Sequence, residues 1–207
     1  TPFTLDGYLD FCKSVYDKYD INKVVFMGDI LDHHYSSYHE TDPSGYNADD
    51  EFDLAKQMLQ GYYTAFPNAT VLIGNHDSII LRKFKTAGLS KNWVKDFKVA
   101  LGTPTWKFKN SCIIDDIFFY HGVGRKPKMK ARDEGMSCCA GHYHSDSYVI
   151  HYNNAKGDSW FGMQVGTGIN QDEYAFDYAK HGKTARVNVG VIINGIPSII
   201  PYKEDLK

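Results

Sequence analysis

The hydrophobic positions in the first half of the chain repeat in two alternating ways. Apolar side chains recur at helical spacing after Thr4, a residue type that caps helices, so we expect a helix to about residue 19. A short apolar run then stops at Gly28-Asp29 and predicts a buried strand. The same patterns predict helices at 49–63, 79–86 and 90–99 and a strand at 70–73. This alternation is typical of an α/β protein.

From Trp106 onward the pattern changes to short apolar runs separated by turn residues. These runs predict strands at 106–108, 112–114, 117–120, 137–140, 148–152, 160–165, 187–193 and 197–200, with a weak helical pattern at 173–180. The sequence has no internal repeat, low-complexity tract or linker. We therefore expect residues 1–207 to form a single domain, in which the two halves form two packed sheets.

Composition excludes several classes of protein. The 207 residues are 43% hydrophobic and 23% charged, which is ordinary for a globular protein with one core. A net charge of −2 gives no overall basic field that would attract nucleic acid or a membrane surface. No run approaches the roughly 18 apolar residues of a membrane helix. The four cysteines lack CxxC spacing, so we expect a reduced cytoplasmic protein without a disulfide framework or zinc knuckle. We assign Trp93, Trp106 and Trp160 to packing.

Four of the predicted strands end at polar residues of one chemical type. These strand ends supply Asp29; Asn75, His76 and Asp77; His121; and His142 and His144. Each motif alone also fits an ordinary turn or a hydrogen-bonded histidine. Ligands gather at the carboxyl ends of strands in α/β sheets, so we expect the four ends to converge. Imidazole, carboxylate and amide donors without thiolates suit divalent ions such as Mn, Fe, Zn or Ni.

Together these motifs resemble those of the calcineurin-like metallophosphoesterase superfamily. The matching segments are Gly28-Asp29-x-x-Asp32, Gly74-Asn75-His76-Asp77, His121-Gly122 and Gly141-His142-x-His144. The resemblance implies a four-layer α/β/β/α sandwich of two mixed sheets flanked by helices. It also implies two divalent metal ions, with Asp29 as the bridge, Asn75, His121 and His142 completing one site, and His144 in the other. Manganese is the preferred metal, with iron, zinc, nickel or magnesium as alternatives.

The resemblance further implies a reaction. A hydroxide that bridges the metals attacks phosphorus in line, while His76 faces the substrate phosphate as electrostatic stabiliser or proton donor. Asp77 orients His76, and Asp32 supports the site without binding a metal. The segments FGMQVGTGIN and YAFDYAK resemble the phage and prophage branch of the family, which would place the protein in the cytoplasm of a bacterial host.

One motif of the family is missing from this sequence. The family completes the second metal site with an Asp-x-His at the end of a strand before the first helix, whereas this chain starts at Thr1, directly before that helix. We therefore expect the native protein to carry such a strand upstream. Two alternatives remain, namely that His33, His34 or His39 serves as a ligand, or that the protein holds one metal. We favour a position for these histidines at the edge of the substrate-binding site. The alternative is that they are solvent-exposed loop residues without a role in binding.

Weaker signals bear on the substrate. Residues 125–132 include five cations. In a loop that follows His121, Arg125 and Lys126 would bind phosphates of the substrate. Arg82, Lys83 and Lys85 could add to this binding. A solvated charged face is the alternative. The segment from His33 to Asp50 should form a long loop over the site, in which Tyr35, Tyr38 and His39 contact a base or Tyr35 and Tyr38 hold the loop to the core.

These observations favour a metal-dependent phosphodiesterase or nuclease that acts on a phage-related DNA, RNA or nucleotide and does not bind membranes. The alternatives are a phosphomonoesterase that acts on a metabolite or phosphoprotein, and a non-catalytic scaffold of the same fold. The oligomeric state has no signal in the sequence.

Overall fold

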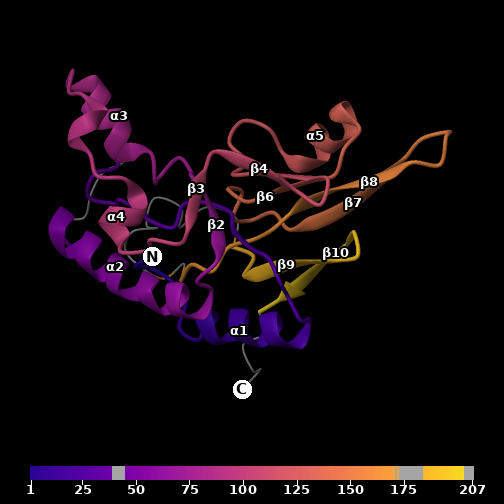
Figure 1. Ribbon diagram of the computed structural model, residues 1–207, viewed down its shortest axis with the longest axis horizontal. Helices are drawn as coiled ribbons and strands as arrows, with labels where there is room; N and C mark the ends of the chain where they lie inside the picture. The colour runs from indigo at the N-terminus through magenta and orange to yellow at the C-terminus, as the bar shows by residue number, and fades with distance from the viewer. Residues whose placement is uncertain (39–44, 171, 173–183, 203–207) are drawn as a thin grey trace.

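The computed structural model describes residues 1–38, 45–170, 172 and 184–202. Its first half alternates helices and strands, and its second half is rich in strands (Figure 1). The first-half elements are α1 (Tyr8–Lys18), β1 (Val24–Phe26), α2 (Ala48–Ala65), β2 (Ala69–Leu72), α3 (Ile79–Thr86), the 3₁₀ turn η1 (Lys91–Trp93), α4 (Phe97–Leu101) and β3 (Lys107–Lys109). The second-half elements are β4 (Ser111–Ile114), β5 (Ile117–Tyr120), α5 (Pro127–Glu134), β6 (Cys138–Ala140), β7 (Tyr148–Asn153), β8 (Ser159–Gln164), β9 (Asn188–Ile193) and β10 (Ile196–Pro201).

The strands form three sheets in the described part of the chain. The first sheet has the order β1-β2-β3 and is parallel throughout. The second has the order β4-β5-β6-β8-β7, in which the three inner strands are parallel and the outer two run antiparallel to their neighbours. A hairpin of β9 and β10 forms the third. Parallel pairing brings the carboxyl ends of β1 and β2 to one edge, and those of β5 and β6 to one edge.

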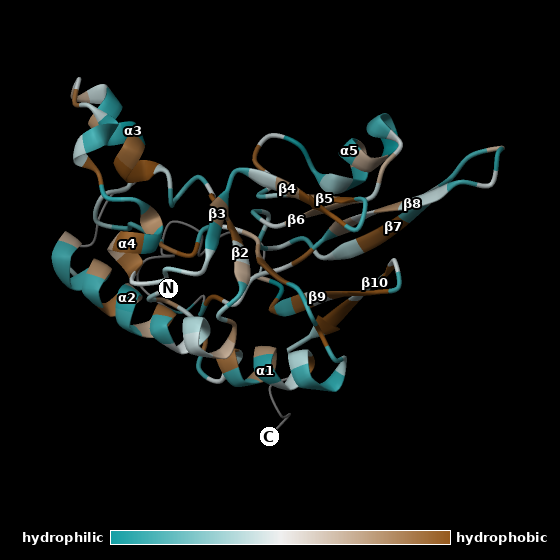
Figure 2. Ribbon diagram, in the orientation of Figure 1, coloured by the Kyte–Doolittle hydropathy of each residue, from teal (hydrophilic) through white to brown (hydrophobic). Residues whose placement is uncertain are grey.

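Two apolar clusters cover the opposite faces of β1 and β2. On one face, Phe26 and Val71 pack with side chains of α1 and α2. On the other, Val25 and Leu72 pack with side chains of the second sheet, among them Phe119. This side-to-side alternation is the strand period of two. Figure 2 shows the matching pattern on α2, where hydrophobic and hydrophilic residues alternate around the helix.

The chain is therefore a mixed α/β protein with parallel and mixed sheets, as the hydrophobic pattern predicts. On the second sheet the described helix is the short α5, whose Ala131 carbonyl accepts a hydrogen bond from Trp160 Nε1 at 2.7 Å. The complete four-layer sandwich stays a prediction, as do the single domain and the upstream strand. None of the described helices is both long and apolar enough to cross a membrane.

Four local predictions are wrong. Helix α1 begins at Tyr8 with Gly7 at its N-cap, whereas Thr4 forms a β-bridge with Ile169. Residues 127–134 form helix α5 rather than a loop, because Pro127 occupies its first turn and Gly135, at φ 62°, ends it. The predicted helix 90–99 is instead η1 followed by α4, which Asp96 caps by accepting a hydrogen bond from Lys98 N. Trp93 does not pack in the core, because 82% of it is exposed. The predicted helix at 173–180 lies outside the described residues.

Candidate active site

The loop after β1 holds Asp29 close to Gly74 and places Gly28 against His121. Gly28 has φ 96°, and a Cβ on it would lie 2.6 Å from His121 Nδ1. A Cβ on Gly74 would lie 2.0 Å from Asp29 Oδ1, so both positions need glycine for close approach. Asp29 itself has φ 53°, a conformation that non-glycine residues rarely adopt. Such strain occurs most often at functional sites, where the surroundings hold it in place.

Asp77 holds this loop against the loop that follows β2. Its buried carboxylate accepts hydrogen bonds from the backbone N–H groups of Asp29 and Gly74, both at 2.8 Å, and of Leu31 at 3.0 Å. Burial raises the pKa of Asp77 to about 6, helped by the charge of Asp29 and opposed by these hydrogen bonds. The contacts of Asp77 are thus with the backbone. Direct orientation of His76 by Asp77, which the resemblance implies, is not what this geometry provides.

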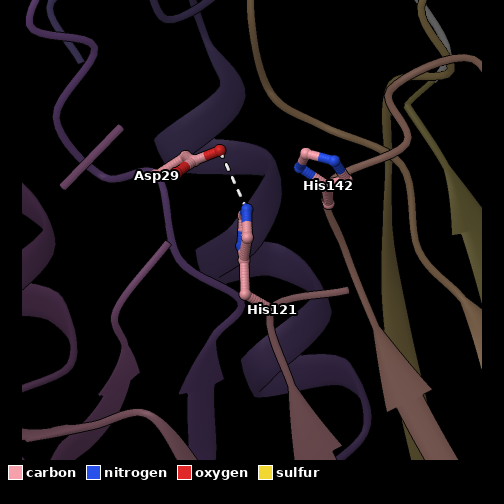
Figure 3. A group of neighbouring side chains, drawn as sticks. All are labelled: Asp29, His121 and His142. Atoms are coloured by element: carbon pink, nitrogen blue, oxygen red, sulfur yellow. Dashed lines mark ion pairs between the residues drawn. The ribbon is translucent and has the colours of Figure 1, made fainter. Parts of the chain in front are cut away.

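His121 is the centre of the site. Its Nδ1 lies 2.7 Å from the Met27 carbonyl oxygen, so Nδ1 carries a hydrogen and donates it. Its Nε2 lies 3.0 Å from Asp29 Oδ2 (Figure 3). The same nitrogen lies 3.0 Å from Asn75 Oδ1. A neutral imidazole would therefore aim a lone pair at two electron-rich oxygens. Three such atoms at these distances need a proton or a cation between them, so this donor set fits a metal ion.

His142 completes this group from the end of β6. Ligand atoms of Asp29, His121 and His142 all lie within 4.8 Å of one another. The rings of His121 and His142 meet edge to face, with centroids 5.1 Å apart. Burial lowers the pKa of His142, and the neighbouring His121 lowers it further, so His142 is a neutral imidazole that can bind a metal. His142 has φ 72°, a second strained residue in the site.

His144 lies at the same cavity but outside this close group. A cavity of about 940 Å³ is bordered by Asp29, His76, His142 and His144 and extends along β1 to the turn between β9 and β10. Burial lowers the pKa of His144, with a further lowering from His76 and His121. His144 is therefore also held neutral beside the site, in a form that suits a metal ligand.

His76 pairs with Asp32. Its Nδ1 lies 2.8 Å from the Asp32 carbonyl oxygen and 3.3 Å from Asp32 Oδ1. Its backbone N–H donates to Asp29 Oδ1 at 2.9 Å. Burial lowers the pKa of His76, but Asp32 and Asp29 outweigh it and raise the pKa to about 9. Asp32 is therefore the residue that orients the His76 ring and favours its protonated form.

The three histidines predicted for the substrate rim have different positions. His34 is only 6% exposed, and its backbone N–H donates to the buried carboxylate of Glu51, which fixes the start of the loop. His33 has φ 53°, and burial lowers its pKa to about 4, with Asp32 and His76 as neighbouring charges. His39 lies outside the described residues. A rim position is consistent with His33 but not with the buried side chain of His34.

Ion pairs occupy most of the basic run 125–132. Arg125 pairs with Asp133 and Glu134, Lys126 with Asp146, Lys130 with Glu134, and Arg132 with Asp133. Lys126 also lies 4.6 Å above the ring centroid of Tyr143, which in turn packs edge to face on His142. The substrate-binding role of Arg125 and Lys126 stays a prediction, although their charges are largely neutralised within the fold.

Two contacts of the site have no clear signal in the sequence. The Met27 carbonyl that orients His121 is a backbone group, which only the folded geometry can place. Arg82, on α3, reaches back with Nη2 to the Asn75 carbonyl oxygen at 3.0 Å. The sequence indicated Arg82 only as a supporting cation.

The comparison with known proteins agrees with this geometry. The sequence model of the calcineurin-like phosphoesterase family matches residues 2–163, a segment that contains every candidate metal ligand. No curated protein and no solved structure matches the chain. Membership of this family indicates metal-dependent hydrolysis of phosphoric esters, which the cluster of Asp29, His121 and His142 suits. The chain belongs to the calcineurin-like phosphoesterase family.

Proposed function

We propose that this protein hydrolyses phosphodiester bonds at a two-metal centre built around Asp29. The observation that carries the proposal is the convergence of Asp29 Oδ2 and Asn75 Oδ1 on His121 Nε2, each at 3.0 Å, beside the charged pair of His76 and Asp32. A scaffold protein would have no need for this strained, electron-rich cluster in the lining of a cavity.

The residues divide into metal ligands and a proton donor. One ion would be bound by Asp29, Asn75, His121 and His142. The second ion would have Asp29 and His144 among its ligands. When bound, divalent ions supply an activated water and neutralise charge on the phosphoryl oxygens. Manganese is our first choice, because the donors are imidazole, carboxylate and amide without thiolate.

His76 performs the step that a metal does not. Its Nδ1 is engaged by Asp32, so its Nε2 is the nitrogen available to a substrate. An imidazolium with a pKa of about 9 is protonated at neutral pH. It can therefore stabilise a phosphoryl oxygen and donate its Nε2 proton to the departing alkoxide. An alkoxide leaving group needs this proton more than an activated leaving group does.

The phage relationship rests on the FGMQVGTGIN segment, residues 161–170. We retain it as part of the proposal, and with it a phage nucleic acid or nucleotide as the natural substrate. The YAFDYAK segment, residues 174–180, lies outside the described residues and adds nothing structural to it.

The experiment compares two chromogenic substrates with added Mn²⁺, bis-p-nitrophenyl phosphate as the diester and p-nitrophenyl phosphate as the monoester. The wild-type protein should prefer the diester. Asp29→Ala should abolish turnover of both. His76→Ala should lower kcat by about 10² to 10⁴ on a dinucleotide, whose alkoxide leaving group needs the proton, and by less on these activated p-nitrophenyl esters. His151→Ala is the control, since His151 lies exposed on β7. A preference for the monoester would replace the diesterase with a phosphatase, and wild-type rates in Asp29→Ala would remove the site altogether.

A further inference from the structure

Residues 79–95, which we call the arm, form a basic projection next to the candidate site. The arm consists of α3, η1 and the residues between and directly after them, and Figure 1 shows α3 extending beyond the sheets. It carries Arg82, Lys83, Lys85, Lys91 and Lys95, and its sequence contains no acidic residue. Within a protein of net charge −2, this segment is a local concentration of positive charge.

The charges of the arm differ from those of α5. Four of the five cations at 125–132 make ion pairs within the fold. Among the residues that the structure describes, none of the five arm cations pairs with an acid, and all five are exposed. Cations without an acidic partner among the described residues are more available to an anionic ligand than paired ones, which must first break their ion pairs.

The arm also exposes large apolar side chains. Trp93 is 82% exposed, Leu89 53% and Leu81 37%. The ring of Tyr38, itself 63% exposed, lies 5.4 Å from both the Arg82 guanidinium and the Lys83 ammonium. Exposed aromatic rings among cations are the arrangement with which proteins bind single-stranded nucleic acid, since bases stack on the rings and phosphates contact the cations.

A direct hydrogen bond connects the arm to the candidate site. Arg82 Nη2 donates to the Asn75 carbonyl oxygen at 3.0 Å, and Asn75 Oδ1 faces His121 Nε2. Ile79, at the start of α3, is 3% exposed and fixes the helix to the body of the protein. A strand of nucleic acid on the arm would thus lie next to the residues that act on a phosphodiester.

We propose that the arm is a binding surface for single-stranded nucleic acid, with Lys91 and Lys95 on the phosphates and Trp93 stacked on a base. The proposal rests on the proposed function for the fate of the bound strand, but binding itself does not depend on hydrolysis. The proximity to a phosphodiester site favours nucleic acid over an anionic membrane or an acidic protein.

The test measures binding of an oligodeoxythymidylate of about 15 nucleotides in EDTA, where hydrolysis cannot contribute. Fluorescence anisotropy of the oligonucleotide, labelled at one end, measures the affinity of every variant. Quenching of tryptophan fluorescence in proteins that keep Trp93 reports contact with that ring, because Trp106 is 2% exposed and Trp160 is partly buried. Lys91→Ala/Lys95→Ala should lower the slope of log affinity against log salt by about 1.4. Trp93→Ala should weaken binding by about tenfold, and Trp93→Phe should keep most of the affinity.

The matched control is Lys13→Ala/Lys18→Ala, which removes two exposed cations from α1. It should leave affinity and salt slope unchanged. Equal affinity in the arm variants and wild type, an equal loss in the control, or binding to phosphatidylserine vesicles but not to the oligonucleotide would overturn the proposal. Turnover of bis-p-nitrophenyl phosphate with Mn²⁺ reports the proposed function separately, so failure of one does not imply failure of the other.

Discussion

The carboxylate of Asp77 accepts the backbone N–H of Asp29 at 2.8 Å, across a sequence separation of 48 residues. The same carboxylate accepts from Gly74 and Leu31, so one buried side chain connects the loops that carry the candidate ligands Asp29 and Asn75. The positions of two ligands therefore depend on a residue that is not itself predicted to bind metal.

Asp77→Asn should destabilise the protein by about 3 kcal/mol. The amide keeps one acceptor but brings an NH₂ group to a place where backbone donors already point, so a buried N–H loses its partner. Urea denaturation measures this change. Asp115→Asn is the control, because Asp115 belongs to an exposed pair with Lys23 and should cost less than about 1 kcal/mol. Equal stability of the two variants would contradict the role given to Asp77.

The pair of His76 and Asp32 predicts a pH dependence in the metal-free protein. The pKa of His76 is raised to about 9 from 6.5, so the pair stabilises the fold fully below about pH 6.5 and loses this contribution as the pH rises through about 9. NMR titration of the His76 imidazole measures the pKa directly. Asp32→Asn should lower it, and an unchanged pKa in that variant would show that Asp32 is not its cause.

Metal removal should lower thermal stability. An ion that binds only the folded protein, at a free concentration about 100 times its Kd, adds about 2.7 kcal/mol to the free energy of unfolding. EDTA should therefore reduce Tm, and Mn²⁺ should restore it. Calorimetric scans with and without EDTA measure this. His142→Ala should remove most of the metal-dependent increase, and His151→Ala should keep it. An increase of the same size in His142→Ala would place the metal elsewhere.

The four cysteines should react with thiol reagents in an order set by burial. Burial raises the pKa of Cys12 to about 12 and of Cys138 to about 11, raises that of Cys139 strongly, and raises that of Cys112 least. Cys112, half-buried on β4, should therefore be alkylated first and Cys139 last. Mass spectrometry of the native protein after brief iodoacetamide treatment gives the order. Early modification of Cys139 would contradict the packing of β6.

Much of this arrangement could be predicted from the sequence because strand ends carry a strong signal. The runs before Asp29, Asn75, His121 and His142 are apolar and short, and parallel strands deliver their ends to a common place. The helix at 79–86, which the sequence indicates by a weaker helical pattern, is confirmed as α3.

Other features depend on contacts that no local pattern encodes. The choice of Asp32 rather than Asp77 as the partner of His76 depends on how two loops pack. Helix α5 has a dense run of cations and little apolar periodicity, although Pro127 and Gly135 mark a helix start and end. Trp93 is exposed because it lies on the projecting arm and does not pack on the core, which an apolar residue type alone does not reveal.

The most direct test of the central claim is anomalous diffraction from crystals of the Mn²⁺-loaded protein. The account predicts a manganese peak within bonding distance, about 2.0–2.3 Å, of Asp29, Asn75, His121 and His142 side-chain atoms. A manganese peak bound by other residues, or no peak among these four at saturating Mn²⁺, would contradict it.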